Sequence, residues 1–436
     1  MDNVEFHLAP DQRKHVEEIA TKNQDIHINR RARLLLSYDA GNTTKDVADE
    51  VGLCRGRARY WRRQFILHGM DIFPAQEQQA PSIINTLEED IDAVPRQEHI
   101  TVPSAEPVLP QKPITYPRPF SKIGIEPDDS MAEAGRKALL FHFAEMLSHE
   151  EGTRAGEDIE ELHDMRVATR RMRAAFRIFG VYFTDKSIKP HLKDLRTSGR
   201  VLGRVRDLDV FIDKAYRYLE TLPEENRSGL DPLVGTWLAE RESARARMLT
   251  YLESEAYDSF KRKFYKFLTS PGEGVKSVEG DNPLPNLVKD TAPVLIYTRW
   301  ASVRAYDSIL SNASLEQLHA LRIEFKQLRY AVEFFREVLG DQTKSIIQEL
   351  KTVQDHLGDL NDARVACQLL TDFLAEWETR LADLSLANRQ SPEAIVAFLA
   401  YKHAERHQLM VTFPQTWEKF IRHDFHKNLA LAVSVL

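Results

Sequence analysis

Cysteine and glycine are both scarce in this sequence. Its 436 residues include two cysteines, Cys54 and Cys367, which lie far apart and outside any paired-cysteine motif. A disulfide framework and a thiolate metal site are therefore not expected. Eighteen glycines are too few for a turn-rich all-β protein. We expect a helical protein of a reducing, cytoplasmic setting, without a metal or other cofactor.

Long apolar runs and enzyme signatures are missing as well. No stretch approaches the ~18 apolar residues that cross a bilayer, and the first residues, MDNVEFHLAP, lack the pattern of a signal peptide. The sequence contains no GxxxxGK(S/T) phosphate loop, no H-E-x-x-H zinc motif and no G-x-S-x-G nucleophile motif. It therefore predicts no membrane partner and no recognisable catalytic centre.

Proline is concentrated in one region. Ten of the 20 prolines lie between residues 74 and 128, among scattered acids and without a sustained apolar period. This composition predicts an extended linker over 74–130. Before the linker, 1–73 is expected to form a three-helix unit broken at Gly41 and Gly52. After it, 131–436 has apolar residues at helical spacing nearly throughout.

A motif of one histidine and three cations occurs twice in the helical part, 156 residues apart. Its copies are His163, Arg166, Arg170, Arg173 and His319, Arg322, Lys326, Arg329. Two further blocks recur in the same order at similar offsets, Leu202-Gly203 as Leu357-Gly358 and Leu238-Ala239 as Leu399-Ala400. The sequence therefore predicts a duplicated helical unit, with copies at about 131–270 and 285–436.

The four motif residues of each copy fall within one 80° arc of an ideal helix, at 100° per residue. Such a charge run is usually a solvated helix face. Here apolar residues border the arc on both sides, which favours an arc that points between helices. Because the net charge is −7, a polyanion site must come from local grouping of this kind. Buried Arg, Lys and His side chains need anions, and nearby Asp207, Glu333 and Asp362 are too few, so a chain of phosphates fits.

The stretches HDMRVATRRMR with LGRVRDLDV, and LHALRIEFKQLRYAVEFF with HLGDLNDA, resemble the CHAD domain, the conserved-histidine α-helical domain family, over about 131–436. The resemblance implies two pseudo-symmetric four-helix bundles around a basic channel. It also implies binding of inorganic polyphosphate without catalysis, which would place the protein at polyphosphate granules or the nucleoid. Carried over by position, the eight motif residues line this channel. Weaker candidates are Arg196, Arg241, Arg245, Lys351, Lys402 and Arg406, and from one copy alone Arg204 and Arg206.

The N-terminal stretch TTKDVADEVGLCRGRARYWRRQF resembles the helix-turn-helix of homeodomain-like transposases. Its second helix would carry the DNA-binding candidates Arg55, Arg57, Arg59, Arg62 and Arg63. Such trihelical units also serve as protein-contact modules, and this alternative stays open.

Two rival functions remain for the whole chain. One is a DNA-binding regulator whose helical repeat dimerises. The other is a phosphate-polymer enzyme without a recognisable catalytic motif. Some relatives carry a triphosphatase with E-x-E-x-K near its start, but the comparable stretch here, NVEFHL, has one Glu.

Overall fold

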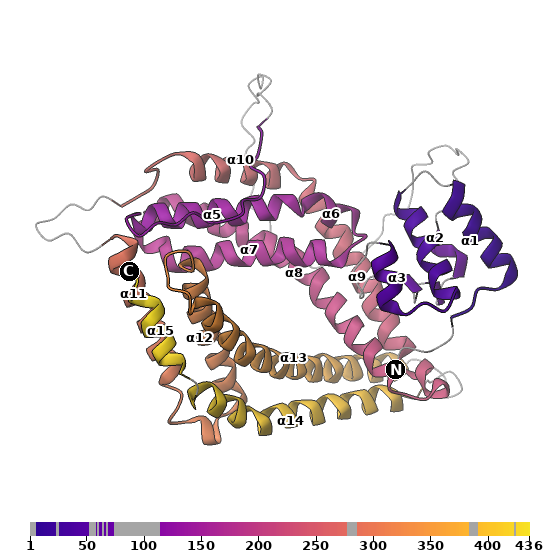
Figure 1. The fold of residues 1–436 in the computed structure, drawn as a ribbon. Helices are drawn as coiled ribbons and strands as arrows, with labels where there is room; N and C mark the ends of the chain where they lie inside the picture. The colour runs from indigo at the N-terminus through magenta and orange to yellow at the C-terminus, as the bar shows by residue number, and fades with distance from the viewer. Residues whose placement is uncertain are drawn as a thin grey trace, which may run out of the picture. The chain divides into compact units, whose positions relative to one another are not determined.

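Two compact units make up the chain in this computed structural model, Met1–Ile114 and Thr115–Leu436. The structure describes residues 6–22, 26–51, 58, 61–62, 65–66, 69–73, 114–276, 286–382, 391–422 and 424–436. Within these residues the regular elements are helices, with two isolated β-bridges. The prediction of an all-α protein is confirmed (Figure 1).

The first unit contains α1 (Pro10–Lys22), α2 (Ile26–Asp39), α3 (Thr44–Val51) and the short 3-10 helix η1 (Gly69–Ile72). Its core gathers buried apolar side chains such as Val16, Leu35 and Phe65. α2 ends before Gly41, whose φ of 82° lies in the left-handed region that glycine adopts without strain. The predicted break at Gly41 is therefore confirmed, whereas Gly52 lies outside the described residues.

Residues 115–130, expected to end the extended linker, belong instead to the second unit. The Tyr116 ring packs against the core of that unit, and the Glu337 carboxylate accepts the backbone N–H of Ile123 at 2.8 Å. The linker prediction is corrected here, because a proline-rich composition disfavours regular structure without preventing apolar side chains from packing. The rest of the predicted linker, 74–113, lies outside the described residues.

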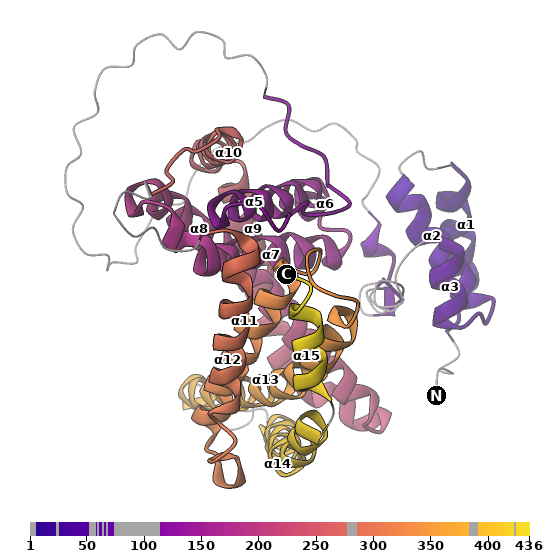
Figure 2. The same cartoon turned by 60° about the vertical axis from the view of Figure 1, so that its left-hand side comes forward.

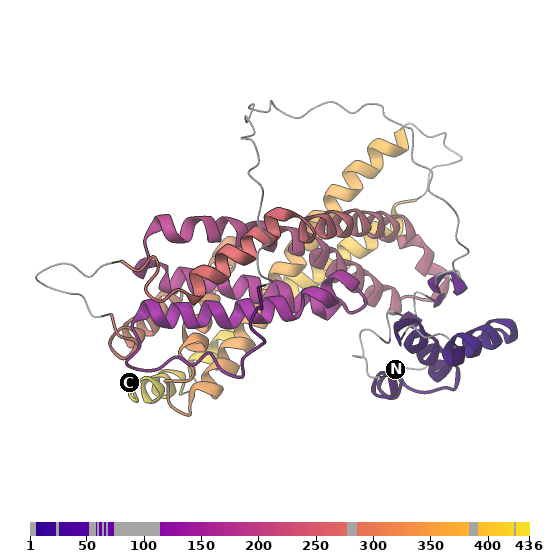
Figure 3. The ribbon, with the colours of Figure 1, turned by 90° about the horizontal axis from the view of Figure 1, so that it is seen from above.

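The first copy of the repeat folds into helices that pack side by side (Figures 1 and 3). They are α5 (Met131–Ser148), α6 (Glu150–Ala155), α7 (Ile159–Phe179), η2 (Gly180–Tyr182), α8 (Asp185–Glu220), η3 (Glu224–Leu230), α9 (Asp231–Leu252) and α10 (Glu255–Thr269). Side chains of Ser130, Asp158 and Ser254 each accept a backbone N–H in the first turn of α5, α7 and α10. Such caps satisfy donors that a helix start leaves unpaired, so they fix where these helices begin.

The second copy contains a corresponding set of helices. They are α11 (Val288–Arg304), η4 (Leu310–Asn312), α12 (Leu315–Phe334), α13 (Thr343–Ala382), α14 (Glu393–Arg422) and α15 (Phe425–Val433). A reciprocal capping box between Ser314 and Gln317 begins α12. The helix that carries the second basic motif is therefore fixed at its start by its own sequence.

The two copies place their motifs at equivalent points. His163 is the fifth residue of α7, and His319 is the fifth residue of α12. α7 packs against α5 and α8, as α12 packs against α11 and α13, while α9 and α14 complete the two sets against α8 and α13. Figure 2 shows the two copies as neighbouring layers of the second unit. The predicted duplication into two pseudo-symmetric four-helix bundles is confirmed.

Candidate functional site

The first basic motif forms a continuous stripe on α7. We call His163, Arg166, Arg170 and Arg173 the first stripe, and all four side chains are half-buried. The residues between them, such as Leu162, Met165 and Met172, are buried in the core. α7 therefore turns its apolar side to the core and holds the cations at the edge of that core.

The second motif forms an equivalent stripe on α12. We call His319, Arg322, Lys326 and Arg329 the second stripe, and these side chains are also half-buried. Leu321, Phe325 and Leu328 of the same helix are fully buried. Of the apolar residues expected to border the second arc, Ile323 is 39% exposed, and the others are buried, namely Leu318, Phe325, Tyr330, Val332 and Phe334.

The two stripes lie close enough to repel one another. Burial lowers the pKa of Lys326 to about 7, and four neighbouring cations add to the effect, namely Arg322, Arg170, Arg329 and Arg166. Two of these, Arg170 and Arg166, lie on α7. Burial, and to a smaller extent Arg170, also lowers the pKa of Arg322. The first and second stripes therefore form one electrostatic cluster.

Carboxylates offset part of this charge. Oδ1 of Asp207 lies 3.1 Å from Nη2 of Arg166. The Glu333 carboxylate lies 3.4 Å from Nη1 of Arg329 and 3.6 Å from Nη2 of Arg171, which also ties α12 to α7. Lys326 and Arg170 have no ion pair of this kind among the described residues, so the centre of the cluster keeps an excess of positive charge.

Several buried polar atoms of the cluster have no hydrogen-bond partner among the described residues. They are Nδ1 of His163, Nε of Arg170, Arg322 and Arg329, and the hydroxyl of Tyr330. Buried polar atoms in native proteins are nearly always hydrogen-bonded, and an unpaired one requires an explanation. Their concentration on two facing helices indicates a place where an anionic ligand would supply the acceptors.

The two stripe histidines have different surroundings. Nδ1 of His319 donates to Oδ1 of Asn361 at 2.9 Å. At the corresponding place in the first copy stands Arg206, and burial followed by the Arg206 charge lowers the pKa of His163. The neutral form of His163 is therefore favoured, while Asn361 fixes the orientation of the His319 ring.

Among the weaker candidates, Arg196 is placed near the first stripe. Its side chain is exposed on α8, and its charge is one cause of the lowered pKa of Arg173, after burial and Arg177. Lys351, its counterpart on α13, is exposed as well. Arg204 points to another partner, because its Nη2 donates to Glu240 at 2.6 Å.

Arg241 and Arg245 of α9 are used within the first bundle. Nε of Arg241 donates to Oδ1 of Asp209 at 2.5 Å, so its charge is neutralised by a buried carboxylate. Nη2 of Arg245 donates to the backbone oxygens of Arg154 and Ala155 at the end of α6. Both residues therefore have donors that are engaged within the fold.

Lys402 and Arg406 of α14 have local partners too. Nζ of Lys402, on a buried side chain, donates to Oε2 of Glu405 at 2.7 Å and lies over the Phe398 ring. Nη2 of Arg406 lies 3.0 Å from Nδ1 of His403. The repeat alignment found cations at matching positions, but it could not show that these two interact with residues of their own helix.

Sequence reasoning missed Tyr330 and Lys214. The aromatic ring of Tyr330 lies among the apolar residues that border the arc, and its counterpart in the first copy is Ala174, so repeated residues do not reveal it. Nζ of Lys214 on α8 donates to Oδ2 of Asp362 on α13 at 2.9 Å, linking the copies. The Lys214 interaction joins residues 148 apart and leaves no local signal in the sequence.

Most of the DNA-binding candidates cannot be placed. Arg55, Arg57, Arg59 and Arg63 lie outside the described residues. The guanidinium of Arg62 lies 5.0 Å from the Tyr38 ring centroid, and it also approaches Phe6. Arg62 therefore takes part in packing of the first unit.

The described part of the chain contains no His, Cys, Asp and Glu group arranged to hold a metal ion. No helix within that part has the length and apolar character to cross a membrane.

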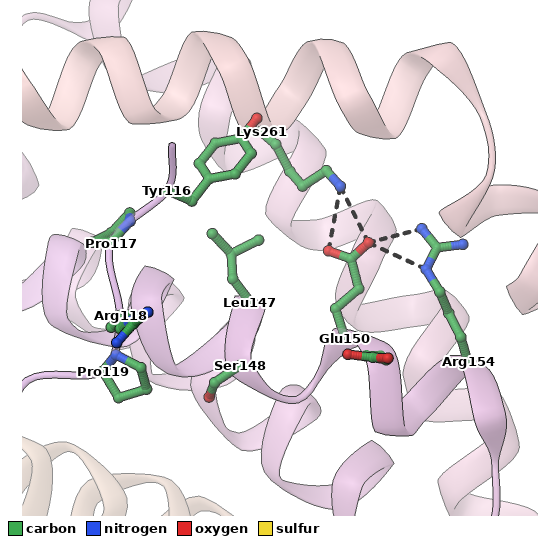
Figure 4. Close-up of a pocket in the computed structure, with 10 residues that line it drawn as sticks. Tyr116, Pro117, Arg118, Pro119, Leu147, Ser148, Glu150, Arg154 and Lys261 are labelled. Atoms are coloured by element: carbon green, nitrogen blue, oxygen red, sulfur yellow. Dashed lines mark hydrogen bonds and ion pairs between the residues drawn. The ribbon is translucent and has the colours of Figure 1, made fainter. Parts of the chain in front are cut away.

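A pocket of about 460 Å³ lies in the second unit, between the segment 116–119 and helices α5, α6 and α10 (Figure 4). Its central carboxylate, Glu150, accepts from Arg154 at 2.8 Å, from Lys261 at 3.1 Å and from Tyr257 at 3.1 Å. These polar groups satisfy one another, in contrast to the unpaired atoms of the stripes.

Several known proteins are similar to this chain. The family model of the CHAD domain matches residues 137–371. Among solved structures, the CHAD domain from the plant Ricinus communis aligns with a TM-score of 0.51 at 22% identity, over 73% of this chain and 97% of that one. PptA from Streptomyces chartreusis aligns with a TM-score of 0.49 at 14% identity, over 66% of this chain and 100% of that one.

Curated relatives add little about function. Two Mycobacterium tuberculosis proteins, Rv2226 and its counterpart in a second strain, are both described as uncharacterized. Each is 25% identical over 245 residues, which is 54% of this chain and 44% of the relative. The chain thus spans less than half the length of these relatives.

The family match includes both stripes, since residues 163–173 and 319–329 lie within the matched range. It extends over more than half of the chain, and the Ricinus structure shows the same all-α fold. Domains of this family generally bind a ligand and do not catalyse a reaction. The chain therefore belongs to the CHAD-domain family.

Proposed function

We propose that the second unit binds inorganic polyphosphate between the first and second stripes, without chemical conversion of the polymer. The observation that carries this proposal is the cluster of unpaired buried polar atoms on α7 and α12, set among cations that repel one another. A bound polyanion would pair both the charges and the donors. CHAD domains are known as a polyphosphate-binding family, which supports the same ligand.

The chemistry of the stripes favours phosphate chains over other anions. The guanidinium groups of Arg166, Arg170, Arg322 and Arg329 present flat pairs of N–H donors that match phosphate oxygens. A polymer with negative charge on every unit can contact both helices at once, whereas a single phosphate would leave most of the cations unpaired. Binding alone is proposed because the centre of the cluster presents donors and cations, a combination suited to holding phosphates.

Titration of the full-length protein tests the proposal. Long-chain polyphosphate, ATP and duplex DNA would be titrated by calorimetry at several salt concentrations. We expect polyphosphate to bind tightest, with a log-log salt slope of roughly −0.7 for each phosphate contact, as for single-stranded polyanions. Two results would contradict the proposal. One is a nearly flat salt dependence of polyphosphate binding, and the other is tighter binding of DNA than of polyphosphate while the second unit is intact.

A further inference from the structure

Tyr330 is an uncharged polar residue at the centre of a cationic cluster. It lies on α12, one helical turn after Lys326, and its side chain is 7% exposed. Its hydroxyl is buried and has no hydrogen-bond partner among the described residues. Removing a hydroxyl from water without a replacement partner destabilises the folded protein, so the position of this group requires a reason.

The cations around Tyr330 cannot accept a hydrogen bond from its hydroxyl. Tyr330 lies near enough to Arg173 of α7 and Arg322 of α12 to influence the pKa of each. The Arg329 guanidinium lies 5.6 Å from the centroid of its ring. Guanidinium groups are donors only, and the nearby Glu333 carboxylate is already engaged by Arg329 and Arg171. The phenol is therefore a donor among guanidinium donors, and its hydroxyl makes no hydrogen bond to Glu333.

The hydroxyl is a feature of one copy alone. The equivalent residue of the first copy is Ala174, which has no polar group and is buried on α7. A purely structural role that both bundles required would place similar residues at both positions. The difference indicates that the hydroxyl makes a contact needed from the second copy alone, within the site that the two copies share.

We propose that the Tyr330 hydroxyl donates a hydrogen bond to an oxygen of the phosphate chain held between the two stripes, and that it is a specificity-determining contact. This inference rests on the proposed function. Because the hydroxyl is buried, a phosphate chain reaches it only when neighbouring side chains change rotamer, and Arg329, whose guanidinium lies 5.6 Å from the ring centroid, is one such neighbour. The contact adds affinity without adding charge, so it selects for a correctly placed acceptor oxygen.

The experiment compares Tyr330→Phe with wild-type full-length protein. Loss of a hydrogen bond to a charged oxygen should weaken binding of long-chain polyphosphate about tenfold or more. The salt slope should stay the same, because no cation has been removed. Without ligand, the melting temperature should be unchanged or higher by about 1–3 °C, because an unpaired buried hydroxyl has been deleted.

Tyr257→Phe is the matched control. Tyr257 is fully buried, and its hydroxyl donates to Glu150 at 3.1 Å, away from both stripes. This variant should lower the melting temperature and leave polyphosphate affinity unchanged. The two variants remove the same atom and are expected to have opposite consequences.

Three outcomes would overturn the inference, and only the third would also overturn the proposed function. Equal affinity of Tyr330→Phe and wild type would leave polyphosphate binding intact while excluding the hydroxyl as a contact. A fall in affinity together with a lower melting temperature would assign Tyr330 to packing. Failure of the wild-type protein to bind polyphosphate would remove the proposed function together with this contact.

Discussion

The two copies share a stripe of cations but differ in how its histidine is held. In the second copy Asn361 accepts a hydrogen bond from His319 at 2.9 Å. In the first copy Arg206 occupies the corresponding place and helps to lower the pKa of His163. The same histidine position is therefore oriented by a neutral amide on one side of the site, and on the other its neutral form is favoured by burial and a cation.

A second difference lies within the stripes themselves. Arg170 of the first stripe corresponds to Lys326 of the second, and Ala174 corresponds to Tyr330. Guanidinium groups stay charged at all physiological pH values, whereas an amine with a pKa of about 7 gains and loses its proton there. Positive charge is therefore present in both copies, while the titrating amine and the neutral donor belong to the second copy.

Charge reversal should produce the largest effect and tests whether the copies form one site. Arg166→Glu with Arg170→Glu places anionic side chains beside the second stripe, so long-chain affinity should fall on the order of 1,000-fold. Arg322→Glu with Lys326→Glu should do nearly the same. Calorimetry would measure affinity and stoichiometry together. If each variant instead kept one site of unchanged affinity at half the stoichiometry, the two copies would be independent sites and the prediction of a shared site would be wrong.

The control for charge reversal changes the net charge equally outside the stripes. Lys419 and Arg422 are exposed at the end of α14. Lys419→Glu with Arg422→Glu should reduce long-chain affinity less than about tenfold, because exposed charges are screened by salt. A loss as large as that of the stripe variants would mean that overall charge, rather than the stripes, governs binding.

Much of this arrangement could be predicted from the sequence because it depends on local periodicity. The stripes follow from helical spacing, and their direction follows from apolar shoulders such as Phe325, which is fully buried. The break at Gly41 follows from local backbone preference. Features of this kind need no knowledge of which helix packs against which.

The remaining features depend on contacts between distant segments. Arg241 looks like a stripe residue until Asp209 of another helix is seen to neutralise it. Residues 115–130 look like a linker until their side chains are seen to pack on the second unit. Tyr330 was missed because its apolar ring fits the pattern of a shoulder, and only its tertiary neighbours reveal an unpaired hydroxyl.

Lys326 stands in the second stripe where the first stripe has Arg170. Because the amine can be neutral and the guanidinium cannot, we expect the protein to take up a proton when it binds the ligand. At about pH 8 the unliganded Lys326 is mostly neutral, and a phosphate chain would favour its charged form and raise its pKa. Calorimetry in buffers of different ionisation enthalpy should show uptake of close to one proton. Lys326→Arg makes the copies alike and should abolish the uptake, since Arg stays charged. Equal uptake by both proteins would assign the proton to another group.

The same residue predicts how stability depends on pH without ligand. The unfolded chain keeps the Lys326 proton up to about its ordinary pKa of 10.5, whereas the folded chain loses it near 7. Between these values the unfolded state binds more protons, so this residue makes the free energy of unfolding rise with pH. Lys326→Met should remove that contribution and raise stability at pH 7 by about 1–3 kcal/mol. Urea unfolding at pH 7 and pH 9 would measure both effects.

The smallest expected effect concerns the histidines. Arg206→Asn gives the first copy the amide that the second copy has at Asn361. It should raise the pKa of His163, but only in part, because burial is the larger cause of its lowering. Nuclear magnetic resonance titration of the imidazole would measure the change, with Asn361→Ala as the control that leaves His163 unaffected. An unchanged pKa in Arg206→Asn would mean that burial alone accounts for the difference between the copies. A rise to the ordinary value of 6.5 would mean that the Arg206 charge, rather than burial, lowers the pKa of His163.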